Sequence, residues 1–593
     1  MAGDNIVQQI DTYLTELLGG WNIYTTAIVV VILTFLLYSL FTPHDPDTHP
    51  VLLARQSSVS PVRLPGESAV YRSPEITYGH SLRAGLGVKE PGAPKWAAGK
   101  DGDLRDVWRQ TVRGAIGDSG EPTGKTGSIL TVLGKERILE HRLDEVSRQI
   151  NIIGQYIRQH NGQRIAIYLP NSIEFLTTVF GKSTFHSSND PLANQVGVVS
   201  ATTFYGITPI LIPCNLPVET LIHTLQKTKP DFLIAAAGGL PLTDIVRFYG
   251  GLKQVVWVVE EGSRHMDWNE VPEGIGGQAG VGVWHEIVEE KKSTVGTALP
   301  DNTENESLKD LVVIWHGDKD DVGEVVEFTQ ENLVAGIAGI ISSLPVNQRY
   351  NSSDLLLPVE PLSMVYPLAL TFAALYSGAS VVLNSAISQK TDLALATRSV
   401  SPTIVVASPE IITKSINKTR SEMTMGWHKL VYWFETRALT IGGRMPVASI
   451  FSSLFDYARP AIGEQPGKLR LLYVAERANT GCPPLDPVDL SDLRAFTGAR
   501  VVYALTAARV AGAVCQTSIY DYRKDDARKG KHSHFGIPLS SVEVKVVDTP
   551  SHKITDEGDP TGEIVATGPA VAGRQAALGV IGTFRDDGTL AYV

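Results

Sequence analysis

The hydrophobic and polar positions of the chain follow two alternating patterns, one typical of helices and one typical of buried strands. Between residues 139 and 157 apolar residues recur every three or four positions, which predicts an amphipathic helix that ends at Asn161-Gly162. Short apolar runs that predict buried strands lie at residues 164–169, 208–213, 231–236, 253–260, 311–315, 381–383, 402–408 and 469–474. Because helical patterns separate most of these runs, the sequence predicts an α/β fold with mostly parallel sheets flanked by helices.

A different pattern stands near the N-terminus. Residues 23–41 form a run of 19 residues without a charge, about the length that crosses the hydrocarbon core of a bilayer as a helix. Trp21 and Tyr24 lie at one end of the run and Tyr38 and Phe41 at the other, where aromatic side chains suit the membrane interfaces. No basic residue precedes the run and no small-residue cleavage site follows it, so a secretory signal is a poor match. The sequence therefore predicts one transmembrane helix.

The charges around this run predict its orientation. Residues 1–22 contain acidic side chains and no basic one, whereas Arg55, Arg63 and Arg72 follow the run. By the positive-inside rule we expect a short lumenal N-terminus and a cytosolic large domain. As a separate expectation, the membrane is that of the endoplasmic reticulum or is associated with lipid droplets. Residues 42–104 are rich in Pro, Gly and Ser and are expected to form a linker to the large domain at 105–593.

Composition narrows the range of functions. The chain has 593 residues, of which 43% are hydrophobic and 19% charged, so a sizeable core is expected. The net charge of −11 argues against nucleic-acid binding, which needs a basic surface. Cys214, Cys482 and Cys515 are far apart, so neither a disulfide framework nor a metal site is expected.

The most informative stretch begins with the strand predicted at residues 311–315. A polar loop and a short β-branched run follow, and then a helix begins near Thr329, which is placed as its N-cap. Such a layout can present backbone N–H groups to a phosphate. The loop, however, carries one lysine among four carboxylates: Lys319 with Asp318, Asp320, Asp321 and Glu324. These carboxylates would repel a triphosphate by roughly 1 kcal/mol for each close pair in water.

This stretch and several others resemble the large N-terminal domain of the adenylate-forming superfamily, the acyl-CoA synthetases and their relatives. Thr329, Asn332 and Leu333 fit the family's helix that opens Thr-His-x-Asn, and residues 165–176 (IAIYLPNSIEFL) are similar to the segment that opens its large domain. His534-Phe535-Gly536-Ile537-Pro538 and the segments after it resemble its small β-subdomain. The resemblance covers about residues 105–593. It implies two related α/β subdomains and a small β-subdomain at about 510–593.

The same comparison shows that the family's catalytic positions are changed here. Glu324 falls where the family has the lysine of its phosphate loop, and the three aspartates fall among its Gly and Thr positions. Ala507 replaces the glutamate that holds magnesium, and a methyl group cannot ligate a hard cation. Val580 stands where the family's aspartate grips the ribose, and a valine side chain accepts no hydrogen bond. Tyr503 and Thr506 are left as vestigial nucleotide-pocket positions.

Two further expectations follow from the resemblance. The family has a small mobile lid domain with a catalytic lysine, and we expect this lid to be absent because the sequence ends at Val593. An apolar acyl pocket would be lined by the stripe of Met364, Tyr366, Leu370 and Phe372, which at helical spacing is more often plain core.

The sequence thus favours a membrane-anchored, acyl-CoA synthetase-like protein that is catalytically inactive and binds an acyl or lipid ligand or a protein partner. It predicts no catalytic residue, no metal and no cofactor. One alternative is an active long-chain fatty acid–CoA ligase that uses ATP and Mg²⁺ and forms AMP. Another is an interaction scaffold at a membrane surface.

Overall fold

The computed structural model describes most of the chain. The described residues are 19, 21–41, 45–89, 93–94, 96–115, 123–133, 137–180, 207–214, 216–238, 240–259, 279–298, 310–317, 323–384, 393–397, 400–423, 426–445, 462, 468–524, 532–554 and 558–593, with the backbone alone at 35–41, 133, 137 and 395. They form two compact units, Met1–Asp47 and Thr48–Val593, which are described separately.

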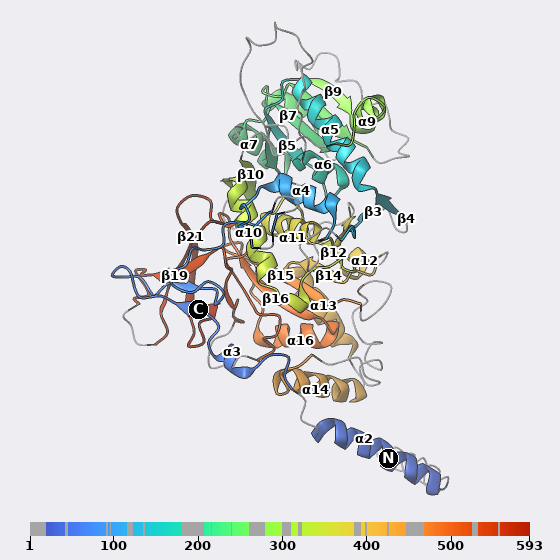
Figure 1. Cartoon of the computed structure of the whole chain (residues 1–593), viewed down its shortest axis with the longest axis vertical. Coiled ribbons are helices and arrows are strands. Elements are labelled where there is room, and N and C mark those ends of the chain that lie inside the picture. Colours follow the sequence, from blue (N-terminus) through green and yellow to red (C-terminus); the bar gives the residue numbers. More distant parts are fainter. Residues whose placement is uncertain are drawn as a thin grey trace, which may run out of the picture. The chain divides into compact units, whose positions relative to one another are not determined.

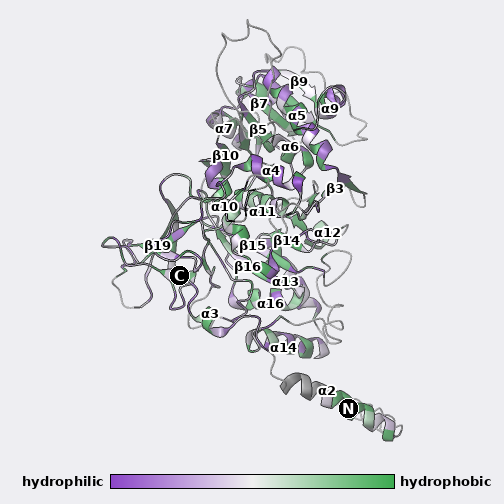
Figure 2. Cartoon of the chain, in the orientation of Figure 1, coloured by the Kyte–Doolittle hydropathy of each residue, from purple (hydrophilic) through white to green (hydrophobic). Residues whose placement is uncertain are grey.

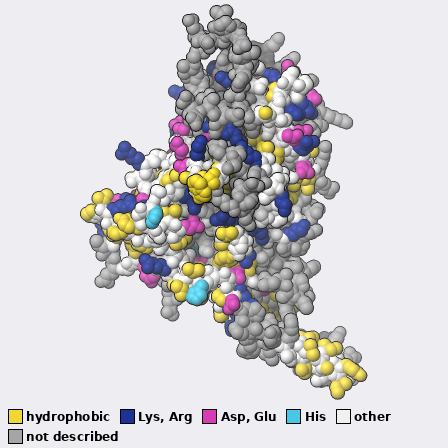
Figure 3. Space-filling model, in the orientation of Figure 1, with side chains coloured by type: hydrophobic (Ala, Val, Ile, Leu, Met, Phe, Trp, Pro, Cys, Tyr) yellow, Lys and Arg dark blue, Asp and Glu magenta, His cyan; other side chains and the backbone are white. Residues whose placement is uncertain are grey.

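The first unit contains helix α2, Ile23–Phe41, so the helix predicted over this run is confirmed as a helix. The Asn22 side chain caps its start by accepting from the backbone N–H groups of Tyr24 and Thr25 at 2.9 and 3.0 Å. Hydrophobic side chains such as Ile23 and Val31 cover the described part of α2 and are 79% and 67% exposed (Figure 3). Over the residues that the structure describes, no helix reaches both the length and the apolar character that crossing a bilayer requires. That α2 spans a membrane stays a prediction.

The second unit contains a seven-stranded sheet in the order β11-β10-β6-β5-β7-β8-β9 (Figure 1). All of its pairs are parallel except β10 with β11. Its strands are β5 (Arg164–Tyr168), β6 (Thr208–Leu211), β7 (Phe232–Ala236), β8 (Gln254–Val258), β9 (Gly280–Val283), β10 (Leu311–Trp315) and β11 (Glu324–Phe328). The helices that alternate with these strands along the chain are α5 (Leu143–Gln159), α6 (Ile173–Phe180), α7 (Val218–Thr228), α8 (Leu242–Phe248) and α9 (Trp284–Lys291).

A nine-stranded sheet follows in the order β18-β17-β16-β15-β14-β12-β13-β3-β4, and it is parallel from β16 to β3. Its strands are β3 (Ile129–Leu133), β4 (Arg137–His141), β12 (Leu355–Pro358), β13 (Ser380–Asn384), β14 (Ile404–Ala407), β15 (Leu471–Arg477), β16 (Arg500–Thr506), β17 (Cys515–Gln516) and β18 (Ile537–Pro538). Its helices are α4 (Leu104–Arg113), α10 (Gln330–Ser342), α11 (Val365–Tyr376), α12 (Leu393–Thr397), α13 (Pro409–Glu422), α14 (Gly426–Thr440) and α16 (Pro487–Thr497), with a 3₁₀ turn at Val346–Gln348. The predicted α/β class with mostly parallel sheets is confirmed.

Helices α10 and α11 lie in the largest core cluster, together with residues of both sheets. Both helices are apolar on nearly every side because they are buried on nearly every side (Figure 2). Tyr366, Leu370 and Phe372 belong to this cluster. Their interpretation as plain core is therefore the one that the structure supports.

The third sheet is antiparallel and has six strands in the order β1-β2-β19-β20-β21-β22. Its C-terminal strands are β19 (Glu543–Val547), β20 (Thr561–Thr567), β21 (Ala576–Phe584) and β22 (Leu590–Tyr592). Strands β1 (Ser58–Val59) and β2 (Tyr71–Arg72) come from the stretch expected as a linker, which also contains helix α3 (Pro50–Ala54). Much of that stretch is therefore folded onto the small β-subdomain.

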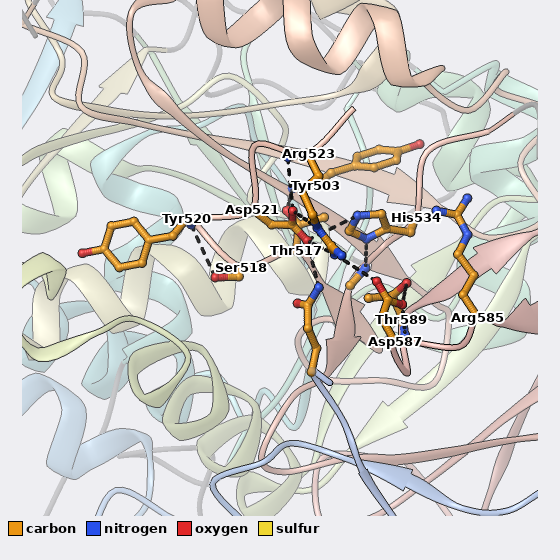
Figure 4. A network of polar contacts seen from close by, with 12 residues as sticks. Tyr503, Thr517, Ser518, Tyr520, Asp521, Arg523, His534, Arg585, Asp587 and Thr589 are labelled. Carbon is orange, nitrogen blue, oxygen red and sulfur yellow. Dashed lines mark hydrogen bonds and ion pairs between the residues drawn. The ribbon is translucent and has the colours of Figure 1, made fainter. Parts of the chain in front are cut away.

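Polar contacts also hold the same N-terminal segment against residues near the C-terminal end of the chain (Figure 4). Gln56 donates from Nε2 to Asp521 Oδ2 at 2.8 Å, and Ser57 donates to the backbone oxygen of Gly588 at 2.5 Å. The Arg523 guanidinium bonds the carboxylates of both Asp521 and Asp587 at 2.7 and 2.9 Å. The buried Asp521 has its pKa held well below its usual range by Arg523, although burial alone would raise it.

Candidate functional site

The predicted acidic loop is described only at its end. Asp318, Asp320 and Asp321 lie outside the described residues, as does Lys319. Glu324 is the first residue of β11, directly opposite Trp315 of β10. Its carboxylate accepts a hydrogen bond from Arg509 Nε at 2.7 Å. A carboxylate thus stands at the start of this strand, and its charge is met by an arginine from the turn after β16.

The helix after the loop begins as the sequence predicts. Thr329 accepts a hydrogen bond from the backbone N–H of Asn332 at 3.2 Å, and Asn332 accepts one from the backbone N–H of Thr329 at 3.1 Å. This capping box satisfies two of the free N–H groups at the start of α10. Asn332 also donates to the backbone oxygens of Pro569 and Val571 at 2.7 and 3.1 Å. The start of α10 is therefore held against the loop that precedes β21.

A cleft of about 550 Å³ opens beside the Glu324–Arg509 pair. Four segments line it: the end of β10 with the start of β11, the turn after β15, the turn after β16, and the start of β21. The Glu324–Arg509 pair lies in its wall, and the rest of the lining is mainly small or polar, with Gly317, Asn479, Ala507 and Gln575. A space of this size lies within the range of small-molecule sites.

A second, much smaller cavity lies next to the cleft and shares Trp315 and Ala507 with it. Its volume is about 10 Å³, about what a single water needs. Arg477 lines this cavity: its guanidinium lies over the Trp315 ring, 4.6 Å from the ring centre, and donates to the backbone oxygen of His316 at 3.2 Å. Its Nε is buried and has no hydrogen-bond partner among the residues that the structure describes.

Two buried carboxyl groups face this arginine. Burial raises the pKa of Glu360 to about 7, while Arg477 opposes the rise. Burial also raises the pKa of Glu476 to about 7, against a hydrogen bond from Tyr503. Burial lowers the pKa of Arg477 itself, and the two glutamates resist that change. The sequence analysis missed this cluster, although the pair Glu476-Arg477 directly continues the apolar run of β15.

The two vestigial nucleotide-pocket positions, Tyr503 and Thr506, belong to β16. Both of their hydroxyl groups contact Glu476 of this cluster. The Tyr503 hydroxyl donates to Glu476 Oε2 at 3.1 Å and accepts from the backbone N–H of Leu485 at 3.1 Å. The Thr506 hydroxyl donates to the backbone oxygen of Glu476 at 2.8 Å. Both side chains are buried, and their hydroxyl groups find hydrogen-bond partners within the protein, on β15 and in the turn that follows it.

The structure also describes the two other changed positions, Ala507 and Val580. Ala507 lines both the cleft and the small cavity, and its methyl group offers no ligand to a cation. Val580 is half-buried in β21 and packs against the second core cluster, while the preceding Leu578 and Gly579 line the cleft. Within the described ranges no group of three or more His, Cys, Asp or Glu side chains is arranged to hold a metal ion.

Comparison with known proteins places this site in a family context. The AMP-binding enzyme family model matches residues 325–574, which include α10, β15 and β16. No curated protein matches the sequence. The match confirms the resemblance of this region to the adenylate-forming superfamily.

Solved structures share the fold at low sequence identity. The anthranilate CoA ligase AuaEII in complex with anthranoyl-AMP is 14% identical with a TM-score of 0.56, over 83% of this chain and 77% of that one. A long-chain-fatty-acid-CoA ligase (FadD1) from Archaeoglobus fulgidus is 14% identical with a TM-score of 0.54, over 86% of this chain and 87% of that one. The N-terminal domain of FACL13 from Mycobacterium tuberculosis is 14% identical with a TM-score of 0.52, over 83% of this chain and all of that one. At these identities the likeness establishes the fold alone.

Proposed function

We infer from the AMP-binding domain at residues 325–574 that the protein is an acyl-CoA synthetase-like protein, and we propose that it is catalytically silent. On this proposal it is held at a membrane by α2 and binds an acyl or lipid ligand without converting it. The cleft of about 550 Å³ is large enough for part of such a ligand.

The observation that carries the proposal is the identity of the side chains that line the cleft and the small cavity beside it. The Arg477 guanidinium lies over Trp315, and the cavity beside Thr506 and Ala507 has only about 10 Å³, next to the larger cleft. The residues present do not fit ATP with Mg²⁺: Ala507 supplies no ligand to the metal, and Glu324 stands where the resemblance has a lysine, with its carboxylate paired to Arg509.

The protein is therefore expected to form no AMP when the full chain is incubated with ATP, Mg²⁺, a long-chain fatty acid and CoA. Each lost charged contact weakens stabilisation of the transition state by about 3 kcal/mol, and such losses compound, so AMP release should lie at least about 10⁴-fold below that of an active ligase. A long-chain-fatty-acid-CoA ligase assayed in parallel supplies that reference. Fatty-acid-dependent AMP release within a hundredfold of it would instead support the active ligase.

Attachment to a membrane has a separate test. Wild-type protein is expected to stay in the membrane fraction after alkaline carbonate washing, and Val31→Lys with Leu33→Lys is expected to release it. Each charge near the middle of a transmembrane helix costs about 2.5–3.5 kcal/mol on the insertion scale. Thr25→Lys with Thr26→Lys, in the first turn of α2, is the matched control. This variant should stay in the membrane because lysine reaches the interface there. Release of the wild-type protein by carbonate would refute the anchor.

A further inference from the structure

Helix α14 is apolar on two opposite faces. Its inner face packs on α16, and Val431 and Leu439 are buried there. On its outer side Trp427, Leu430 and Trp433 are 40%, 56% and 51% exposed. A surface helix of a soluble domain ordinarily has one apolar face, so a second one marks a contact surface.

The charges on this outer side are basic. Within α14 the exposed charged side chains are Lys429 and Arg437, whereas its one acidic residue, Glu435, is buried. The Arg437 guanidinium lies over the Trp433 ring, 5.5 Å from its centre. The whole chain carries a net charge of −11, so these cations do not follow from a basic composition of the chain. Tryptophan and leucine flanked by lysine and arginine are typical of helices that lie in the surface of an anionic bilayer.

Chain connectivity brings this helix to the side where the N-terminal segment enters the fold. Gln56, two residues beyond α3, bonds Asp521, and the next residue, Tyr522, packs in one cluster with Leu439 of α14. Helix α3 begins at Pro50, nine residues after α2 ends at Phe41. Nine extended residues span at most about 30 Å, so a membrane that holds α2 lies within that reach of Pro50.

We propose that the outer face of α14 rests on the surface of the membrane and contacts its anionic lipids. This inference rests on the proposed attachment through α2, and it adds a second contact that orients the large domain. The apolar side chains Trp427, Leu430 and Trp433 enter the headgroup region, while Lys429 and Arg437 face the lipid phosphates. The ligand class is an anionic phospholipid surface.

The test places a fluorescent probe on this face in the full chain. Leu430→Cys is labelled with NBD in a background with Cys214→Ser and Cys482→Ser, and the protein is reconstituted in phosphatidylcholine vesicles with or without phosphatidylserine. Doxyl-labelled lipid is expected to lower the NBD fluorescence roughly twofold when phosphatidylserine is present, because an interfacial helix buries its apolar face by about 5–10 Å. Val218→Cys, an exposed apolar position on α7, is the matched control and should not respond.

A charge exchange adds an independent readout. Lys429→Glu with Arg437→Glu is expected to remove the dependence of quenching on phosphatidylserine, whereas Lys291→Glu with Lys292→Glu, the same charge change at the C-terminal end of α9, should leave it intact. Equal quenching at positions 430 and 218 in vesicles that carry the protein would overturn the inference while leaving the anchor in place, and would leave a protein partner as the occupant of this face. Protein that fails to float with the vesicles would refute the anchor and the inference together.

Discussion

Glu360→Gln is expected to stabilise the protein by about 2 to 3 kcal/mol more at pH 8 than at pH 5. Glu360 is fully buried, and burial raises its pKa from 4.5 to about 7. An unfolded chain releases this proton near pH 4.5, whereas the folded chain keeps it to about pH 7. Each unit of difference corresponds to 1.36 kcal/mol. Glutamine has the same shape and no charge, so the substitution removes this term.

The direction in which stability changes with pH follows from this difference between the folded and unfolded pKa values. A carboxyl group whose pKa is raised by folding contributes its full stability below the unfolded value, and this contribution is lost as the pH rises through the folded value. The wild-type protein should therefore lose stability between about pH 5 and pH 7, which is the window set by Glu360 and by Glu476. Chemical unfolding followed at several pH values measures this slope.

A matched control separates the buried charge from a general effect of glutamine. Glu422 is exposed at the end of α13, and Glu422→Gln should change the free energy of unfolding by less than about 0.5 kcal/mol at either pH. If Glu360→Gln left the pH dependence of unfolding unchanged, Glu360 would be ionised in the folded protein at pH 5, and Arg477 would be its full ion-pair partner.

Gly336→Ala is expected to destabilise the protein by at least about 3 kcal/mol. Gly336 lies inside α10, and a Cβ at this position would stand 1.4 Å from the backbone oxygen of Ala511. Alanine is the better helix former by about 1 kcal/mol, but this gain is small beside the displacement of a backbone segment in the core. Ala511 is itself fixed, because its N–H donates to the backbone oxygen of Ala570 at 2.8 Å.

Gly426→Ala is the control for this prediction, because a Cβ at Gly426 meets nothing within 4 Å. Gly336 lies in the interior of α10 and Gly426 at the first position of α14, and the two sites differ most in the space available to a Cβ. Gly426→Ala should leave the melting temperature unchanged or raise it slightly. A melting temperature for Gly336→Ala equal to that of the wild-type protein would contradict the close approach of α10 to Ala511.

The α/β class could be predicted because buried parallel strands are continuous apolar runs. Residues 311–315 and 469–474 coincide with β10 and β15 within two or three residues. The start of α10 was equally predictable, because Thr329 and Asn332 form their capping box within one turn of chain. In both cases the information is local.

The contents of the site could not be predicted in the same way. That Arg477 lies over Trp315 depends on β15 and β10, which belong to different sheets, and no local pattern reports the distance between them. The pairing of β2 was also hidden, because a strand of two residues is too short to show alternation. Residues 42–104 were therefore expected as a linker, although part of them completes a sheet.

That completed sheet sets an order of events during synthesis. Tyr71 of β2 pairs with Val544 of β19, and 473 residues must be translated after Tyr71 before Val544 is complete. At about 5–20 residues per second, the ribosome needs roughly half a minute to a minute and a half to deliver the partner strand. The N-terminal strand pair must stay accessible throughout that time. Translation that stops before Val544 leaves its edge open to other chains.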